Sequence, residues 1–131
     1  MKELPYREIC GEHAPLCTTG IGKAILANLP PEEWLSRLPE IIPAHTPQTI
    51  TDKDRILQEL QSTRERGFAI DNCEHELNVR CVGVPVYNAR GALVAGISSS
   101  GAMQVMTDRK VMECADILMG ITQRIKERLY A

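Results

Sequence analysis

Apolar and small or polar residues alternate along two neighbouring stretches in the middle of the chain, which predicts a β-hairpin. The stretches are Cys81–Tyr87 and Ala92–Ser100, and the polar segment Asn88–Gly91 between them is typical of a hairpin turn. If Tyr87 pairs with Ala92, side-chain alternation directs one apolar set to a common face. That set is Val82, Val84, Val86, Leu93, Ala95 and Ile97. We expect this face to be core.

The opposite face of the predicted hairpin carries small and polar side chains. They are Cys81, Gly83, Gly96, Ser98 and Ser100, and the same pairing places Cys81 opposite Ser98. A sheet surface with room above it and several hydroxyl groups is typical of the floor of a small-molecule pocket. The alternative is that the glycines mark bulges and the serines begin a loop, and a shift of one residue in register would exchange the two faces.

Helical periodicity and helix-stop signals predict four helices around this hairpin. The first covers Thr18–Leu29, with Thr18 or Thr19 as its cap, and ends before Pro30. Pro31 suits the first turn of a second, short helix that presents Trp34, Leu35 and Leu38. Three prolines between residues 39 and 48 indicate a surface loop.

A third helix follows a possible capping box, Thr51 with Asp54, and Gly67 is expected to end it in a left-handed conformation. Phe68–Asp71 is predicted to be a short strand. Thr107 or Asp108 can begin a final helix with an apolar stripe along one face. The stripe consists of Val111, Ala115, Leu118, Thr122, Ile125 and Leu129. It packs on the sheet or, less favourably, on a second copy of the chain.

The order helix, helix, helix, strand, hairpin, helix predicts an α+β domain with an antiparallel sheet. A chain of 131 residues with 44% hydrophobic residues is long enough for one core and too short for two ordinary domains. We therefore predict a single domain over residues 1–131.

Charge and composition exclude several classes of function. The net charge is -2 and aromatic residues make up 4% of the chain, so neither a positive field nor stacking platforms favour direct binding of nucleic acid. The charged segment Met1–Glu8 and the short apolar runs predict no secretory signal and no membrane span, which implies a cytoplasmic protein. Five cysteines without Cys-x-x-Cys spacing are expected to be free thiols.

Cysteine and histidine residues raise two chemical alternatives. A zinc site could draw on Cys10, His13 and Cys17, with a fourth ligand from Cys73, His75 or Cys81. None of these spacings is a known zinc pattern, so we expect no metal. Cys81 with His75 could act as nucleophile and base of a small cysteine-dependent hydrolase, and spacing alone does not decide that alternative.

The segment Thr18–Lys23 superficially resembles a phosphate-binding loop. It lacks the glycine spacing of a Walker motif, which leaves either a helix start that holds a small anion or a capped start with closely packed glycines. The packed start is favoured locally. Asp71 and Glu74, just before the hairpin, lie within reach of the predicted pocket face.

Several of these motifs, in their order along the chain, resemble the C-terminal effector-binding domain of IclR-type bacterial transcriptional regulators. The matching segments are Ala14–Ala24, Thr49–Asp52, Arg66–Asp71, Glu74 through Arg80–Val82, Pro85–Tyr87 and Ile97–Gly101. The sequence departs from the family at Cys17, where histidine is usual, at Ser99, where an apolar residue is usual, and at Ala102, where proline is usual.

The resemblance implies a GAF-like or profilin-like fold that binds a small organic effector, such as a carboxylate, keto acid or sugar acid. It implies no catalytic residue, no metal and no cofactor. The family's ligand-lining positions fall on Gly20, Ile21, Asp71, Cys81, Ser98 and Ser100. DNA would be bound only through a separate helix-turn-helix domain, and the full regulator would be a dimer or tetramer. The family's first helix and strands have no counterpart here, so we expect a domain that is incomplete at its N-terminus. A third reading is an assembly module that associates through its last helix.

Overall fold

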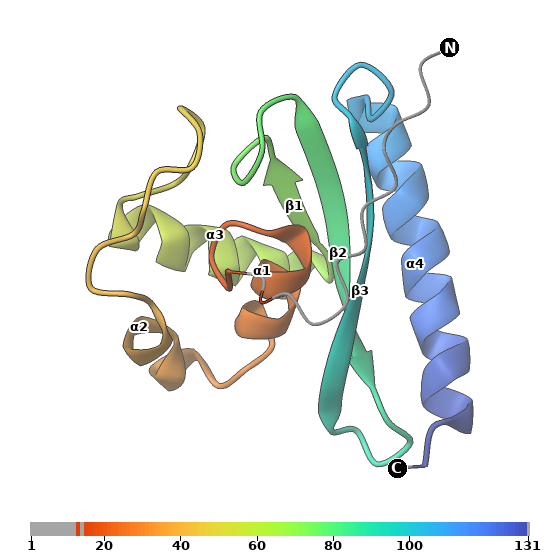
Figure 1. Cartoon of the computed structure of the whole chain (residues 1–131). Helices are drawn as coiled ribbons and strands as arrows, with labels where there is room; N and C mark the ends of the chain where they lie inside the picture. Colours follow the sequence, from red (N-terminus) through yellow and green to blue (C-terminus); the bar gives the residue numbers. More distant parts are fainter. Residues whose placement is uncertain (1–12, 14, 131) are drawn as a thin grey trace.

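A three-stranded antiparallel sheet separates two helical layers in the computed structural model, which describes His13 and residues 15–130 (Figure 1). The helices are α1 (Gly20–Ala27), the 3-10 turn η1 (Pro31–Glu33), α2 (Trp34–Arg37), α3 (Lys53–Arg66) and α4 (Asp108–Arg128). The strands are β1 (Ala69–Asn72), β2 (Val79–Tyr87) and β3 (Leu93–Ala102), with β2 in the centre. Helices α1, α2 and α3 lie on one side of the sheet and α4 covers the other. The predicted α+β architecture is confirmed.

Most of the predicted helix ends are confirmed by hydrogen bonds. The hydroxyl of Thr19 accepts a bond from the Gly22 N–H at 3.0 Å, and that of Thr107 accepts one from the Lys110 N–H at 3.2 Å. Gly67 ends α3 with φ of +91°. The capping box is wrong, because α3 begins after Asp52 without a side-chain cap bond.

The hairpin forms with a register different from the one predicted. Tyr87 pairs with Leu93, and an irregularity beside it shifts the remaining pairs so that Cys81 lies opposite Ser100. Ser98 instead pairs with Gly83. The shift amounts to two residues over most of the hairpin, and because side chains alternate with period two, the small residues stay together on one face. Leu93 is the exception, since it pairs with Tyr87 instead of joining the valine face.

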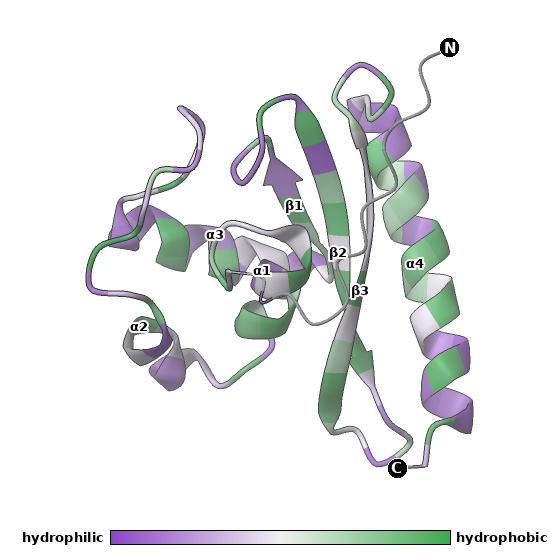
Figure 2. Cartoon of the chain, in the orientation of Figure 1, coloured by the Kyte–Doolittle hydropathy of each residue, from purple (hydrophilic) through white to green (hydrophobic). Residues whose placement is uncertain are grey.

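The valine face of the sheet packs against α4. Val82, Val84, Val111 and Ala115 are buried together, and Ile97 packs against the same cluster. The first half of the predicted stripe on α4 therefore packs within the chain. Ala95 is exposed, so the predicted core face is not buried at that position. Hydrophilic residues gather at both ends of α4 (Figure 2).

A second apolar cluster holds α1, α2 and α3 together on the other side of the sheet. Its buried members include Leu26, Trp34, Ile56 and Leu60. None of the helices in the described part of the chain has the length and apolar character of a membrane span.

Helix α1 rests directly on the glycines of the hairpin. A side chain at Gly83 would lie 2.2 Å from the carbonyl oxygen of Gly20, and one at Gly96 would lie 2.8 Å from Cγ1 of Ile21. The sequence suggested that these glycines leave open space above the sheet, but they do not. They allow the backbone of α1 to approach it.

Candidate functional site

Three polar side chains form a row across the sheet on the face that α1 covers. Asp71 pairs with Cys81, and Cys81 pairs with Ser100, so one residue comes from each strand. The Sγ atom of Cys81 lies 2.9 Å from Oγ of Ser100. On its other side Cys81 is paired with Asp71, whose carboxyl group acts on the pKa of the thiol. The row therefore runs across all three strands, and a hydrogen bond links its Cys81 and Ser100 side chains.

The start of α1 lies over this row. A Cβ atom placed on Gly20 would be 3.3 Å from Cβ of Cys81, and a side chain at Gly83 would be 2.8 Å from the backbone nitrogen of Ile21. Ser98 lies on the same face and pairs with Gly83. The six residues expected to line an effector site thus lie around one part of the sheet, and the hydroxyl-bearing residues Ser98 and Ser100 are exposed there.

Asp71 is the one acidic residue among these six, and it is deeply buried, with 2% of its surface exposed. Its Oδ1 atom accepts a hydrogen bond of 2.8 Å from the backbone N–H of Glu74. Burial raises the pKa of the Asp71 carboxyl group, and the Glu74 N–H works in the opposite direction. Asp71 therefore fixes the β1–β2 loop and lies next to Cys81 on the neighbouring strand.

Burial also controls the chemistry of Cys81, since it raises the pKa of the thiol to about 11. A thiol with this pKa holds only about one part in ten thousand of thiolate at pH 7, far less than an ordinary cysteine. The carboxyl group of Asp71 does not compensate, because it raises the pKa of the thiol further. This environment is the opposite of the one that a nucleophilic cysteine needs.

Alkylation of Cys81 by iodoacetamide is accordingly expected to be at least about tenfold slower at pH 7 than alkylation of N-acetylcysteine. The rate should rise about tenfold per pH unit until the pH approaches the pKa of about 11, because only the thiolate reacts. Mass spectrometry of digested protein would follow Cys81 separately from the other cysteines. Fast labelling that levels off below pH 8 would instead favour the hydrolase.

A buried ion pair anchors the loop next to the row. The Nζ atom of Lys23, which is 1% exposed, lies 2.9 Å from Oε2 of Glu74 and 3.5 Å from Oε1 of Glu59. The same ammonium group donates a hydrogen bond to the carbonyl oxygen of Ile70. Burial raises the pKa of the Glu74 carboxyl group, while the Lys23 charge lowers it. The lysine of the phosphate-loop-like segment thus holds a carboxylate, and the closely packed helix start is confirmed.

Two threonines of the loop before α3 also hold the β1–β2 loop. The hydroxyl groups of Thr46 and Thr49 each donate a bond of 2.6 Å, to the carbonyl oxygens of Cys73 and Glu74 respectively. Both threonines are buried. Thr46 belongs to the predicted surface loop of residues 39–48, and no periodic pattern marks an isolated hydroxyl group that turns inward.

Thr18, just before α1, contacts His75, and neither was among the predicted effector-lining residues. Oγ1 of Thr18 lies 3.4 Å from Nδ1 of His75, whose ring lies edge-on to that of His45 with the centroids 5.0 Å apart. Thr18 and His75 are 57 residues apart in the sequence, so local patterns could not have found this pair.

The candidate metal ligands do not form a metal site in the part of the chain that the structure describes. Among these residues no group of three or more His, Cys, Asp or Glu side chains could hold an ion. Cys10 lies outside the described residues.

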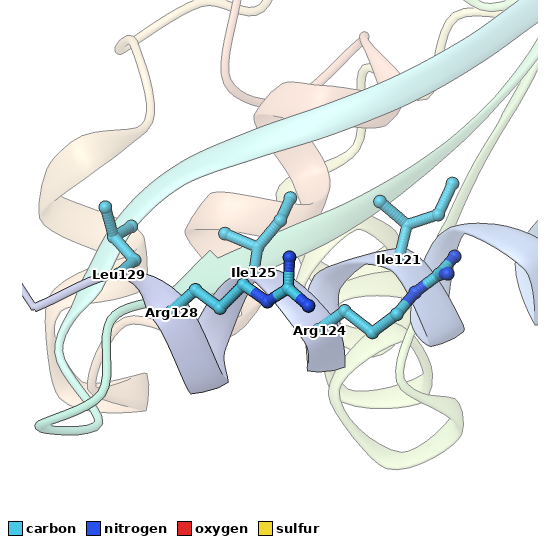
Figure 3. A pocket seen from close by; sticks show the side chains of 5 residues that line it. All are labelled: Ile121, Arg124, Ile125, Arg128 and Leu129. Atoms are coloured by element: carbon cyan, nitrogen blue, oxygen red, sulfur yellow. The ribbon is translucent and has the colours of Figure 1, made fainter.

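A separate, apolar hollow of about 430 Å³ lies along the C-terminal half of α4 (Figure 3). Ile121, Ile125 and Leu129 point from the helix into it, and Arg124 and Arg128 flank them. The second half of the predicted α4 stripe, Ile125 and Leu129, therefore lines this hollow and is only half-buried.

Comparison with known proteins supports the fold and the resemblance stated above. The family described as the C-terminal domain of the bacterial transcriptional regulator IclR matches residues 1–127. The chain belongs to this family. It is therefore an effector-binding domain of an IclR-type transcriptional regulator.

Similar proteins of this family are longer regulators. BhcR, a helix-turn-helix-type transcriptional regulator of Paracoccus denitrificans, is 34% identical over 110 residues, which are 83% of this chain and 39% of BhcR. The repressor AllR of Escherichia coli is 30% identical over 120 residues, or 91% of this chain and 44% of AllR. The chain thus spans less than half the length of these two curated relatives.

Solved structures show the same fold. The IclR protein of Thermotoga maritima has a TM-score of 0.87 at 36% identity, covering 99% of this chain and 53% of that protein. The inducer-binding domain of a PobR double mutant from Acinetobacter, in complex with 3-hydroxybenzoic acid, has a TM-score of 0.84 at 25% identity. That match covers 93% of this chain and 73% of the PobR chain.

Proposed function

We propose that this domain senses a small organic acid at the row Asp71–Cys81–Ser100 and signals its presence to a helix-turn-helix domain. The observation that carries the proposal is the position of the α1 start over this row, with Gly20 against Cys81. Ser98 and Ser100 supply exposed hydroxyl groups that can donate to a carboxylate, and the backbone N–H groups at Gly20 and Ile21 lie at a helix N-terminus. The PobR relative supports an acid as ligand, because it is described with 3-hydroxybenzoic acid.

Each residue has a separate role in this proposal. The serines bind the carboxylate, and Cys81 packs beside the ligand as a neutral thiol. Asp71 acts mainly by orienting Cys81, since burial leaves little of its carboxyl group accessible. The site binds without catalysis, because Cys81 lacks the environment of a nucleophile. We also propose that the regulator is a cytoplasmic homo-oligomer.

A thermal-shift screen of the protein against small hydroxy and keto acids would identify the effector, because a ligand of the native state raises the melting temperature. The double variant Ser98→Ala/Ser100→Ala is expected to bind that acid at least about tenfold more weakly, since each bond to a charged group contributes about 1.5–3 kcal/mol. Isothermal titration calorimetry would measure the change.

Ser99→Ala is the matched control for the serine variants. Ser99 lies on the same strand but pairs with Val82 on the opposite face of the sheet. The Ser99→Ala substitution should therefore leave the affinity for the acid unchanged. Equal affinities for the wild type, the double variant and the control would refute the serine assignment.

A further inference from the structure

We infer that the protein has a second binding site, for a small oxyanion, in a polar cavity on the far side of the Glu74 loop from the row. The cavity has a volume of about 520 Å³ and lies between α3, β1 and the loop before α3. Its lining includes three arginines, Arg55, Arg66 and Arg80, which come from two different elements. Guanidinium groups match phosphate and carboxylate groups in geometry and in charge.

The two carboxylates that also line the cavity are already bound to cations. Glu74 is paired with Lys23 at 2.9 Å, and Glu59 is paired with Arg66 at 3.1 Å. Lys23 lies 3.5 Å from Glu59 as well. The acidic groups of the cavity therefore do not neutralise all of its arginines.

Two of the arginines retain unused donor capacity. Arg55 forms no hydrogen bond or ion pair with any residue that the structure describes, and it lies exposed at the rim. Arg80 is bound at one end, where its guanidinium contacts the carbonyl oxygen of Met106 at 2.7 Å and Asp108 at 3.0 Å. Its Nε atom is buried away from solvent, so the donors that Arg80 can offer to the cavity are the remaining Nη hydrogens.

An oxyanion in the cavity would accept from the unpaired Arg55 and from the remaining Nη hydrogens of Arg80, and Asn72 and Gln48 add polar side chains to the lining. Glu74 separates this site from the proposed effector site: its carboxylate lines the cavity, whereas its backbone N–H binds Asp71. The inference does not rest on the proposed function.

Nuclear magnetic resonance titrations with inorganic phosphate and with citrate, at constant ionic strength, would test the site and show whether it takes phosphates or carboxylates. We expect saturable shifts of the arginine Nε–H signals with at least one of the two anions. Arg55→Gln should weaken that binding about tenfold, because it removes a charged donor. Arg55 is exposed, so the substitution should not unfold the protein.

Arg124→Gln is the matched control, because it removes the same charge from an exposed position on α4 outside the cavity. It should leave the binding of phosphate and citrate unchanged. Binding that persists in Ser98→Ala/Ser100→Ala would place the anion outside the effector site. Shifts that rise without saturation for both anions, or equal weakening in Arg55→Gln and Arg124→Gln, would overturn the inference.

Discussion

Replacing Lys23 with alanine is expected to destabilise the protein by about 3–5 kcal/mol, because the variant leaves a buried carboxylate without its cation. The Nζ atom of Lys23 donates to both carboxylate oxygens of Glu74, at 3.0 and 2.9 Å, and both side chains are almost completely buried. Urea denaturation followed by circular dichroism would measure the free energy of unfolding.

Two further variants separate the buried pair from a general effect of charge. Arg37→Ala breaks an exposed ion pair with Glu33, whose atoms lie 3.7 Å apart, and should cost no more than about 1 kcal/mol. Lys23→Met combined with Glu74→Gln should recover much of the lost stability, because neutral side chains of similar size need no counter-charge. A loss in Lys23→Ala no larger than that in Arg37→Ala would contradict the structural role of the pair.

Replacing Gly83 with alanine is the second change with a large expected effect. The new Cβ atom would lie 2.2 Å from the carbonyl oxygen of Gly20 and 2.4 Å from its carbonyl carbon, so α1 would have to move away from the sheet. Overpacking of this kind costs about 1–3 kcal/mol, and contact with rigid backbone favours the upper end of that range. Binding of the effector should weaken as well, because Gly20 and Ile21 move with the helix.

Gly120→Ala provides the same chemical change where space is available. Gly120 lies within α4, and apart from the surrounding turns of that helix no atom of the described residues lies within 4 Å of the position of an added Cβ. Alanine there should stabilise the helix by about 0.5–1 kcal/mol. Thermal denaturation of both variants would compare them, and equal stability of Gly83→Ala and Gly120→Ala would refute the close packing of α1 on β2.

The elements of this fold were predictable because local patterns determine them. Thr19, Gly67 and Thr107 mark helix ends through bonds or backbone angles that involve residues only a few positions away. The alternation along β2 and β3 likewise identified the two faces of the hairpin. The pairing itself was predicted wrongly, because an irregularity beside Tyr87 shifts the strands and no sequence signal marks it.

Long-range contacts account for what the sequence did not predict. Gly83 and Gly96 indicated missing volume, but they could not show that α1 fills it. Lys23 and Glu74 are separated by 51 residues, and each has an ordinary local explanation, as part of a glycine-rich helix start and of a charged loop. The prediction of the candidate effector residues rested on the resemblance to a family together with the small side chains of one sheet face.

The central claim is that a small organic acid binds beside the start of α1, at the exposed hydroxyl groups at the end of the row Asp71–Cys81–Ser100. Amide chemical-shift mapping of the protein with the acid found by the thermal-shift screen tests this claim most directly. The account predicts saturable changes at Gly20, Ile21, Cys81, Ser98 and Ser100 that share one dissociation constant. Changes confined to the hollow along α4 or to the arginine-lined cavity, with these five amides unaffected, would contradict it.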